Sequence, residues 1–491
     1  MEVLASVWRQ YAATITPLYK HICCTLYSVN SPLGVISAVE VVVLAIVFLI
    51  ALIININAVK TDEYESSGDI NTKIMFVGIL LGFKHNIMNL VLGISFERAL
   101  YLHKCLFTIS WLMTFIHGIP QLIGFKLSEV PSSNALSTPE VSGLILFVLM
   151  TTQLLSYYVF KMISFELFFY MHIATYMAII YMAIRHEATL VAYSLLFMAA
   201  DLLVRFVIKG RRVTVQVKSL SRSKVTCVTL KKLFSYRAGQ YAFIMIPSLG
   251  IHQYHPFTIS SIPSDDDMTM HIKALGDWTT ALSKMSINST AITCFIEGPF
   301  GRPMMDPFND AYQIFILLCG GIGLTPMQAW ANHLLHLHEM KKKVVTKIYY
   351  VWSIRKDMTQ LVNELVTTKM LPLPASYDVE VASATQPNTE DSSLPIETGI
   401  YITDVNGADA NDETSIRDCI DPLARKVIHF NRPNMAEVFD KAALLASSCQ
   451  QDRVLVAACG PTSLIDDAIT HCRFKSSKGI TFDLHTDVFD Y

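Results

Sequence analysis

The chain has 491 residues, of which 52% are hydrophobic and 16% charged, and its mean hydropathy is +0.40. Such a composition indicates a membrane protein, and a net charge of −2 gives no reason to expect nucleic acid as a partner. Ten cysteines occur without any CxxC pair, so neither a zinc site nor a disulfide framework is indicated.

The first part of the chain predicts a helical membrane domain. Residues 1–34 are mixed in character and are expected to form a cytosolic or interfacial lead-in, with no basic segment and cleavage site of a signal peptide. Six apolar stretches within residues 35–209 are each near the length needed to cross a bilayer. They are Val35–Ile56, Ile74–Ile94, Leu100–Phe125, Gly143–Phe160, Phe165–Ile184 and Ala188–Val207. The sequence therefore predicts a six-span, multi-pass integral membrane bundle.

The lysines and arginines between these stretches predict the orientation of the bundle. With a cytosolic N-terminus, eight of them fall on the inner side and four on the outer side. The inner ones are Arg9, Lys20, Arg98, Lys104, Lys161, Lys209, Arg211 and Arg212, and the outer ones are Lys60, Lys73, Lys126 and Arg185. Both termini are therefore expected in the cytosol, while the sequence leaves plasma membrane and endoplasmic reticulum open as locations.

Two of the apolar stretches each carry a pair of histidines fourteen positions apart, His103 with His117 and His172 with His186. Fourteen helical residues return a side chain to within about 40° of its starting direction and advance it by about 21 Å. A single histidine in an apolar helix is more often a hydrogen-bonded core residue, but ionisable groups within a membrane usually mark a functional path. The repeated spacing predicts two bis-imidazole haem sites. Because both helices run outward, His103 should pair with His172 on the cytosolic side and His117 with His186 on the far side.

From residue 210 the pattern is that of a water-soluble protein. Residues 210–307 contain VTVQVKSL, KVTCVTLKK, QYAFIMIP, MTMHIKAL and AITCFIEG, which alternate with period two. With no helix of useful length between them, they predict an antiparallel β-barrel. Residues 308–491 alternate buried strand and helix, with strand candidates KIYYVWSIR, YDVEVASAT, GIYITDV and KVIHFNRP, and predict a doubly wound parallel sheet.

A glycine turn in the second of these domains predicts a nucleotide site. Gly320, Gly321 and Gly323, followed by Thr325-Pro326, stand between a buried strand and a helix. Glycines there let backbone N–H groups approach a pyrophosphate, although tight packing alone explains many such turns. Arg355 follows a strand and is a candidate to pair with an adenosine 2′-phosphate, the alternative being an ordinary solvated arginine.

Several further short motifs stand in the membrane part and in both water-soluble domains. The segment His255-Pro256-Phe257-Thr258-Ile259-Ser260 lies in the barrel, with an aromatic ring, hydroxyls and an imidazole suited to a flavin. Two shorter segments are Gly298-Pro299-Phe300-Gly301 and Cys459-Gly460-Pro461. Near the first histidine stretch stands GISFER at residues 93–98, and Asp201 with Arg205 follows the second.

Together these segments resemble the ferric reductase and NADPH oxidase family over residues 70–491, and the fungal-type metalloreductases most. The resemblance implies a flavin domain at residues 210–307 and an NADP domain at 308–491. It also implies FAD, two haems b and NADPH as cofactors. The residues it places at the flavin are His255, Pro256, Phe257, Thr258, Ser260, Gly276, Trp278, Thr279, Gly298 and Gly301. It places Gly320, Gly321, Gly323, Thr325, Pro326, Arg355, Gly460 and Pro461 at the nucleotide, Cys459 near the nicotinamide, and an aromatic such as Phe489 over the flavin ring.

The activity implied is transfer of electrons from NADPH across the membrane to an extracytosolic acceptor. A ferric or cupric ion is the first expectation, and the alternative is an oxidase that reduces dioxygen to superoxide. A membrane scaffold that has lost catalysis is the alternative from another class, and it would be expected to lack part of these motifs.

Overall fold

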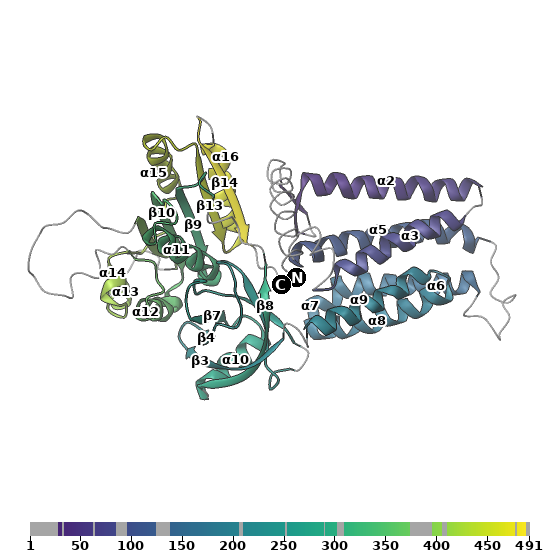
Figure 1. Ribbon diagram of the computed structural model, residues 1–491, viewed down its shortest axis with the longest axis horizontal. Coiled ribbons are helices and arrows are strands. Elements are labelled where there is room, and N and C mark those ends of the chain that lie inside the picture. Colours follow the sequence, from purple (N-terminus) through teal and green to yellow (C-terminus); the bar gives the residue numbers. More distant parts are fainter. Residues whose placement is uncertain are drawn as a thin grey trace, which may run out of the picture. The chain divides into compact units, whose positions relative to one another are not determined.

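A computed structural model describes residues 28–31, 34–61, 64–84, 96–123, 138–205, 210–250, 253–288, 290–301, 309–373, 395–404, 410–476 and 479–487. Its contacts divide the chain into two units, Met1–Ile208 and Lys209–Tyr491. Figure 1 draws the first unit as long helices and the second as two sheets with their helices. Phe489, YDVEVASAT and the first half of the GISFER segment, residues 93–95, lie outside the described residues.

The first unit is helical after a short antiparallel hairpin of β1 (Ser28–Ser31) and β2 (Gly34–Ser37). Its helices are α2 (Ala38–Thr61), α3 (Tyr64–Leu81), α5 (Phe96–Leu122), α6 (Pro139–Leu155), α7 (Lys161–Ile163), α8 (Phe165–Arg185) and α9 (Ser194–Leu203). A π-helical turn, η3 (Ser156–Phe160), joins α6 to α7, and a 3₁₀ turn, η4 (Thr189–Tyr193), precedes α9. Arg205, two residues beyond α9, donates to the buried Asp201 carboxylate of that helix at 2.8 Å.

Four stretches among the described residues are long and apolar enough to cross a membrane. They are Val42–Thr61, Arg98–Leu122, Pro139–Ile163 and Leu167–Arg185. Of the six predicted spans, these account for the first, third, fourth and fifth. The sixth corresponds to a shorter apolar helical stretch, Thr189–Leu203. The protein is thus a multi-pass membrane protein by its apolar helices, with four candidate spans in the part of the chain that the structure describes.

The predicted second span, Ile74–Ile94, begins at the wrong residue, and its part from residue 85 onward lies outside the described residues. The helix α3 begins ten residues earlier, at Tyr64, and ends at Leu81, so Lys84 lies in the turn beyond it and not in its middle. Polar residues of α3 are buried against neighbouring helices: Asn71 bonds to Asn55 of α2, and Ser67 to His117 of α5. Hydropathy alone missed this first half because its polar groups are satisfied by partners and not by water.

The first sheet of the second unit is antiparallel, as expected. Its strands are β3 (Arg211–Leu220), β4 (Val225–Lys231), β5 (Tyr241–Met245), β6 (His255–Thr258), β7 (Asp267–Lys273) and β8 (Ala291–Phe300), in the order β6-β5-β8-β3-β4-β7. The expectation of no helix between these strands was wrong, because α10 (Asp277–Asn288) separates β7 from β8. Its buried Trp278, Leu282 and Ser286 recur every four residues, which is the spacing of one helical face.

The second sheet is wholly parallel, which confirms the prediction. It contains β9 (Ile314–Gly320), β10 (Lys347–Ile354), β11 (Ile396–Ile402), β12 (Ile428–His429), β13 (Arg453–Cys459) and β14 (Thr481–Asp487), in the order β12-β11-β10-β9-β13-β14. The connections are α11 (Leu324–Glu339), α12 (Thr359–Thr367), α13 (Ala410–Asp418), α14 (Pro422–Arg425), α15 (Met435–Ser448) and α16 (Thr462–Lys475). The last strand, β14, was not predicted, since its only pattern is the short run TFDLH.

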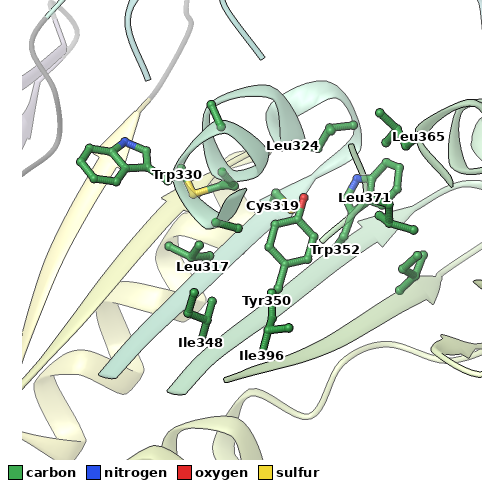
Figure 2. Packing of buried hydrophobic residues seen from close by; sticks show 14 of the residues in the cluster. Leu317, Cys319, Leu324, Trp330, Ile348, Tyr350, Trp352, Leu365, Leu371 and Ile396 are labelled. Atoms are coloured by element: carbon green, nitrogen blue, oxygen red, sulfur yellow. The ribbon is translucent and has the colours of Figure 1, made fainter. Parts of the chain in front are cut away.

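Apolar clusters cover both faces of the parallel sheet. Figure 2 shows one of them, in which Cys319, Tyr350 and Trp352 lie among leucines and isoleucines of the strands and of the helices above them. The opposite face packs Phe439 and its neighbours against β9 and β13. Burial on both faces explains why these strands read as continuous apolar runs.

Candidate functional site

Two histidines of the helical unit face each other across α5 and α8. The ring centroids of His103 and His172 are 6.2 Å apart, with an angle of 63° between the planes. His103 Nδ1 lies 2.7 Å from the carbonyl oxygen of Gly78 in the last turn of α3. A carbonyl only accepts hydrogen bonds, so Nδ1 carries the proton and Nε2 keeps its lone pair. His172 Nδ1 is held by the side-chain amide of Gln153 in α6, at 2.6 Å.

The second pair is anchored by serine hydroxyls. His117 Nδ1 lies 2.7 Å from Ser67 Oγ, and His186 Nδ1 lies 3.1 Å from Ser142 Oγ. Each serine already gives its own proton to a backbone carbonyl of the preceding turn. Each hydroxyl therefore accepts from the histidine, which again protonates Nδ1 and leaves Nε2 free.

This donor set fits haem. A histidine that binds a metal almost always donates its other ring N–H to a protein acceptor, which fixes the tautomer and the ring orientation. The Gly78 carbonyl and two serine hydroxyls whose own protons are already donated elsewhere accept from three of the four rings, and the fourth ring is held by an amide. One further contact touches a free nitrogen: Gln121 Nε2 lies 3.5 Å from His117 Nε2. The anchors Ser67, Gly78, Ser142 and Gln153 were missed from the sequence, where no signal marks them beyond their spacing.

Glycines make room for these rings. A Cβ on Gly143 of α6 would lie 2.9 Å from His186 Cε1, and one on Gly82, directly after α3, would lie 3.2 Å from His103 Nδ1. A Cβ on Gly68 would lie 3.6 Å from His117 Cε1. The chain in and directly after α3, and α6, thus approach the histidine helices closely at the level of His103, His117 and His186.

The nucleotide candidates meet between β9 and β13, where the order in which successive strands are added to the parallel sheet reverses. The strands β9 and β13 are neighbours although β10, β11 and β12 lie between them in the chain. Ligands of such sheets bind outside the carboxyl ends of the strands at this switch point. A Cβ on Gly323 would lie 2.4 Å from the Cys459 carbonyl oxygen, and one on Gly320 would lie 2.5 Å from Pro461 Cδ. Two distant motifs therefore interlock at one edge of the sheet.

The remaining nucleotide candidates surround this edge. Gly321 has φ of +55° and open space beside its Cα, and its carbonyl accepts from Trp352 Nε1 at 2.9 Å. Thr325 and Pro326 are buried in the first turn of α11, where Thr325 donates to the Ile322 carbonyl. Gly460 follows β13 directly, and Cys459 is 2% exposed.

Arg355 lies directly after β10, on the same carboxyl edge. Its side chain is 74% exposed, and its Nε is 3.7 Å from Asp404 Oδ2, beyond β11. The Asp404 carboxylate also accepts from the backbone N–H of Lys356 at 2.8 Å. The guanidinium is therefore only loosely paired and is accessible to an anion.

The flavin candidates form an aromatic group around β6. Trp278 of α10 lies against His255 and Phe257, with ring centroids 4.5 and 5.8 Å apart, respectively. Pro256 stands between these two in the strand, and Thr258 is 7% exposed at its end. Gly301 has φ of +83°, and a Cβ there would lie 2.9 Å from the Tyr241 ring, while a Cβ on Gly298 would lie 2.8 Å from Phe234.

Two of these candidates have bonding partners within the protein. Ser260 is fully buried, and its hydroxyl bonds to the Thr269 carbonyl and to His271 Nδ1, at 3.0 and 2.8 Å. Thr279 Oγ1 accepts from the N–H groups of Leu275 and Gly276 at the start of α10. Both hydroxyls thus join local elements together, whereas a Cβ on Gly276 would meet no atom within 4 Å.

The folds and sites described above define a class: an oxidoreductase with an apolar helical region, a flavin-type antiparallel domain and a nucleotide-type parallel domain. Family comparison agrees. Residues 67–183 match the ferric reductase like transmembrane component, 208–304 an FAD-binding domain, and 312–473 the ferric reductase NAD binding domain. The chain belongs to the ferric reductase and NADPH oxidase family and is an oxidoreductase of that type.

Individual relatives are distant. A superoxide-generating NADPH oxidase heavy chain of Dictyostelium discoideum is 22% identical, over 86% of this chain and 67% of that protein. The chloroplastic ferric reduction oxidase 7 of Arabidopsis thaliana is 26% identical, over 67% of this chain and 50% of that protein. Among solved structures, a ferredoxin NADP+ reductase from Neisseria gonorrhoeae with bound FAD and NADP is 12% identical. It aligns with 57% of this chain and 98% of its own, with a TM-score of 0.37.

Proposed function

We propose that the protein transfers electrons from cytosolic NADPH, through FAD and two b-type haems, to an acceptor on the far side of a membrane. The observation that carries this proposal is the set of four histidines whose Nδ1 atoms are all held by protein groups. The pairs His103–His172 and His117–His186 would each hold one haem between α5 and α8. Haem bound there supplies one-electron transfer through an apolar medium.

The nucleotide edge of the parallel sheet has two tasks. The backbone of Gly320–Gly323 leads into α11, where N–H groups at a helix start attract a pyrophosphate. Arg355 would bind a 2′-phosphate from solvent, and Cys459 would lie beside the nicotinamide at the end of β13. The adjacent Gly460 keeps this edge free of side-chain bulk.

In the antiparallel domain, the aromatic group of His255, Phe257 and Trp278 would form one wall of the flavin site. A bound flavin accepts a hydride and releases single electrons. The remaining proposed contacts are Pro256, Thr258, Ser260, Gly276, Thr279, Gly298 and Gly301, with Phe489 as the cover of the ring.

The acceptor we propose is a ferric or cupric ion, as in a fungal-type metalloreductase. Three carboxylates lie near the second histidine pair in the chain: Glu187 directly follows His186, while Glu140 and Glu65 stand two positions before Ser142 and Ser67, whose hydroxyls hold His186 and His117. A negative surface raises the local concentration of cations. The proposed orientation puts this pair on the extracytosolic side, with both termini in the cytosol, in the plasma membrane or the endoplasmic reticulum.

Reduction of dioxygen to superoxide is the second candidate, because the relative from Dictyostelium discoideum bears that activity in its name. The two acceptors are separated by protein in liposomes supplied with NADPH on the cytosolic face. Ferric-chelate reduction that persists with superoxide dismutase and without oxygen supports the metal. Superoxide formation without such reduction would reverse the order.

The haem part of the proposal has its own test. A reduced-minus-oxidised absorption spectrum of the purified protein should show b-type haem at two per chain. Replacing any one of the four histidines by alanine should remove about one haem of the two. A wild-type protein without a haem signal would contradict the proposed electron path.

A further inference from the structure

The helices α3 and α6 together anchor all four histidines, at matched positions. Ser67 and Gly78 of α3 hold His117 and His103, and Ser142 and Gln153 of α6 hold His186 and His172. In each helix the two anchors are eleven positions apart, three helical turns, and both helices run antiparallel to the histidine helix they serve. The anchors differ in chemistry: carbonyl and amide for one pair, hydroxyls for the other, with the Pro139 carbonyl also near His186.

The side-chain amide of Gln153 can either donate a hydrogen bond through its nitrogen or accept one through its oxygen. It is 6% exposed, and it contacts His172 Nδ1 on one side and the Thr175 hydroxyl on the other. Thr175 has one hydroxyl proton, and the Met171 carbonyl at 2.7 Å, one turn earlier, accepts it. With the amide oxygen toward Thr175, that oxygen and the Met171 carbonyl would compete for a single proton.

The opposite orientation of the amide removes this competition, and it gives up the 3.3 Å contact between the amide nitrogen and the His172 carbonyl oxygen. The amide N–H then donates to Thr175 Oγ1, Thr175 donates to Met171, and the amide oxygen accepts from His172 Nδ1–H. His172 thereby gains the tautomer that the Gly78 carbonyl imposes on His103, with Nε2 free. The chain of hydrogen bonds from His172 through Gln153 to Thr175 ends at the Met171 carbonyl in the backbone of α8.

We propose that Gln153 is a positioning residue that fixes the tautomer of His172 and lowers the reduction potential of the site formed by His103 and His172. This inference rests on the proposed function. An acceptor on Nδ1–H makes the imidazole a more basic ligand, which stabilises ferric over ferrous iron. Gln153 touches neither substrate nor iron and acts through His172.

The step affected is a single electron transfer without a proton. One electron, supplied by NADPH through the flavin, would reduce a ferric haem held by His103 and His172. The same electron would then pass to a ferric haem held by His117 and His186, and the first haem would return to its ferric state. A lower potential at the first site favours this second transfer.

The test is a potentiometric titration of both haems, followed by absorbance, in the full-length protein. Gln153→Met keeps the volume and removes the acceptor, so one couple should rise, with about a tenfold higher ferrous-to-ferric ratio at fixed ambient potential, or ~59 mV. Gln153→Glu keeps an acceptor and should leave that couple at or below the wild-type value. Ser67→Ala removes the anchor of His117 and should move the other couple only. Ser110→Ala is the matched control, a buried serine of α5 whose hydroxyl bonds to none of the described residues.

Each result decides the inference. A rise confined to one couple in Gln153→Met, with the same couple restored by Gln153→Glu, supports it. Unmoved couples, both couples moving together, or equal shifts in the Met and Glu variants would overturn it. Where Gln153→Met loses haem, a Glu variant with both haems and an upward shift would equally overturn it. A wild-type protein without two haems would contradict the proposed function instead, so the two failures are distinct.

Discussion

Arg355 is the single exposed side chain that we propose selects NADPH over NADH. It extends from the end of β10 with only a loose 3.7 Å contact to Asp404. In Arg355→Ala, KM should rise far more for NADPH than for NADH, because the 2′-phosphate loses a charge-assisted contact. Such a contact is worth about 1.5–3 kcal/mol, so the preference should fall by about ten- to a hundredfold.

Steady-state kinetics with both nucleotides measure this directly. Lys347→Ala is the control, since Lys347 is the first residue of the same strand and lies at the amino ends of the strands, away from the proposed nucleotide site. An equal loss with NADPH and NADH would show that Arg355 supports the fold and does not bind the phosphate.

His271 gives a residue-scale prediction on pH. It is buried in β7 against Ser260, and burial lowers its pKa to about 4. Between pH 6.5 and about 4 the unfolded chain binds a proton that the folded chain does not, so stability falls as pH decreases through this window. The full effect is about 3 kcal/mol, and it is complete below pH 4.

Thermal unfolding, followed by release of flavin fluorescence in detergent, should therefore show a lower midpoint at pH 5 than at pH 7. In His271→Gln, which keeps a hydrogen-bonding group beside Ser260, that difference should shrink. An unchanged pH dependence in the variant would assign it to other groups.

At the scale of elements, the close approach of α6 to α8 depends on Gly143. A Cβ there would lie 2.9 Å from His186 Cε1, so Gly143→Ala should displace the ring and reduce haem content by about one haem of two. Haem is quantified per chain by absorbance. Gly118→Ala is the matched control, because a Cβ at Gly118, beside His117 in α5, would meet no atom within 4 Å. Equal haem content in the two variants would contradict this account.

In the parallel sheet, too, glycines allow two segments to approach each other closely. Gly320 lies against the ring of Pro461, and Gly323 lies against the backbone of Cys459. Neither position therefore has room for a side chain. The glycines therefore serve packing, and their proposed second role is to give a phosphate access to the backbone. Both roles would have one cause, the meeting of β9 and β13 at the switch point.

At the scale of the whole molecule, the proposed electron path has a fixed order. In His117→Ala protein that keeps one haem, NADPH should still reduce that haem, while ferric-chelate reduction collapses. In His103→Ala protein, any remaining haem should stay oxidised with NADPH. Haem content must be measured beside the rates, because each ligand also ties α5 to α8. Normal reduction of the remaining haem by NADPH in His103→Ala would show the order to be wrong.

The sequence by itself determined the features that depend on a repeated spacing or on a short, continuous motif. The doubled histidine spacing, the strand-turn-helix around Gly320, and the parallel sheet follow from periodicity over a few turns or strands, which local residues carry. The helix α10 also had a local signal, in the spacing of Trp278, Leu282 and Ser286, and it was overlooked among the strands.

Only the tertiary structure decided which groups meet. The true extent of α3 and the four anchors depend on polar partners that are sixteen or more positions away and on other helices. Ser260 bonds to His271 on a neighbouring strand, and Gly323 packs against Cys459, 136 positions later in the chain. A hydrogen bond or a close backbone contact leaves no periodic trace in sequence, because its two members are brought together only by the packing of the elements that carry them.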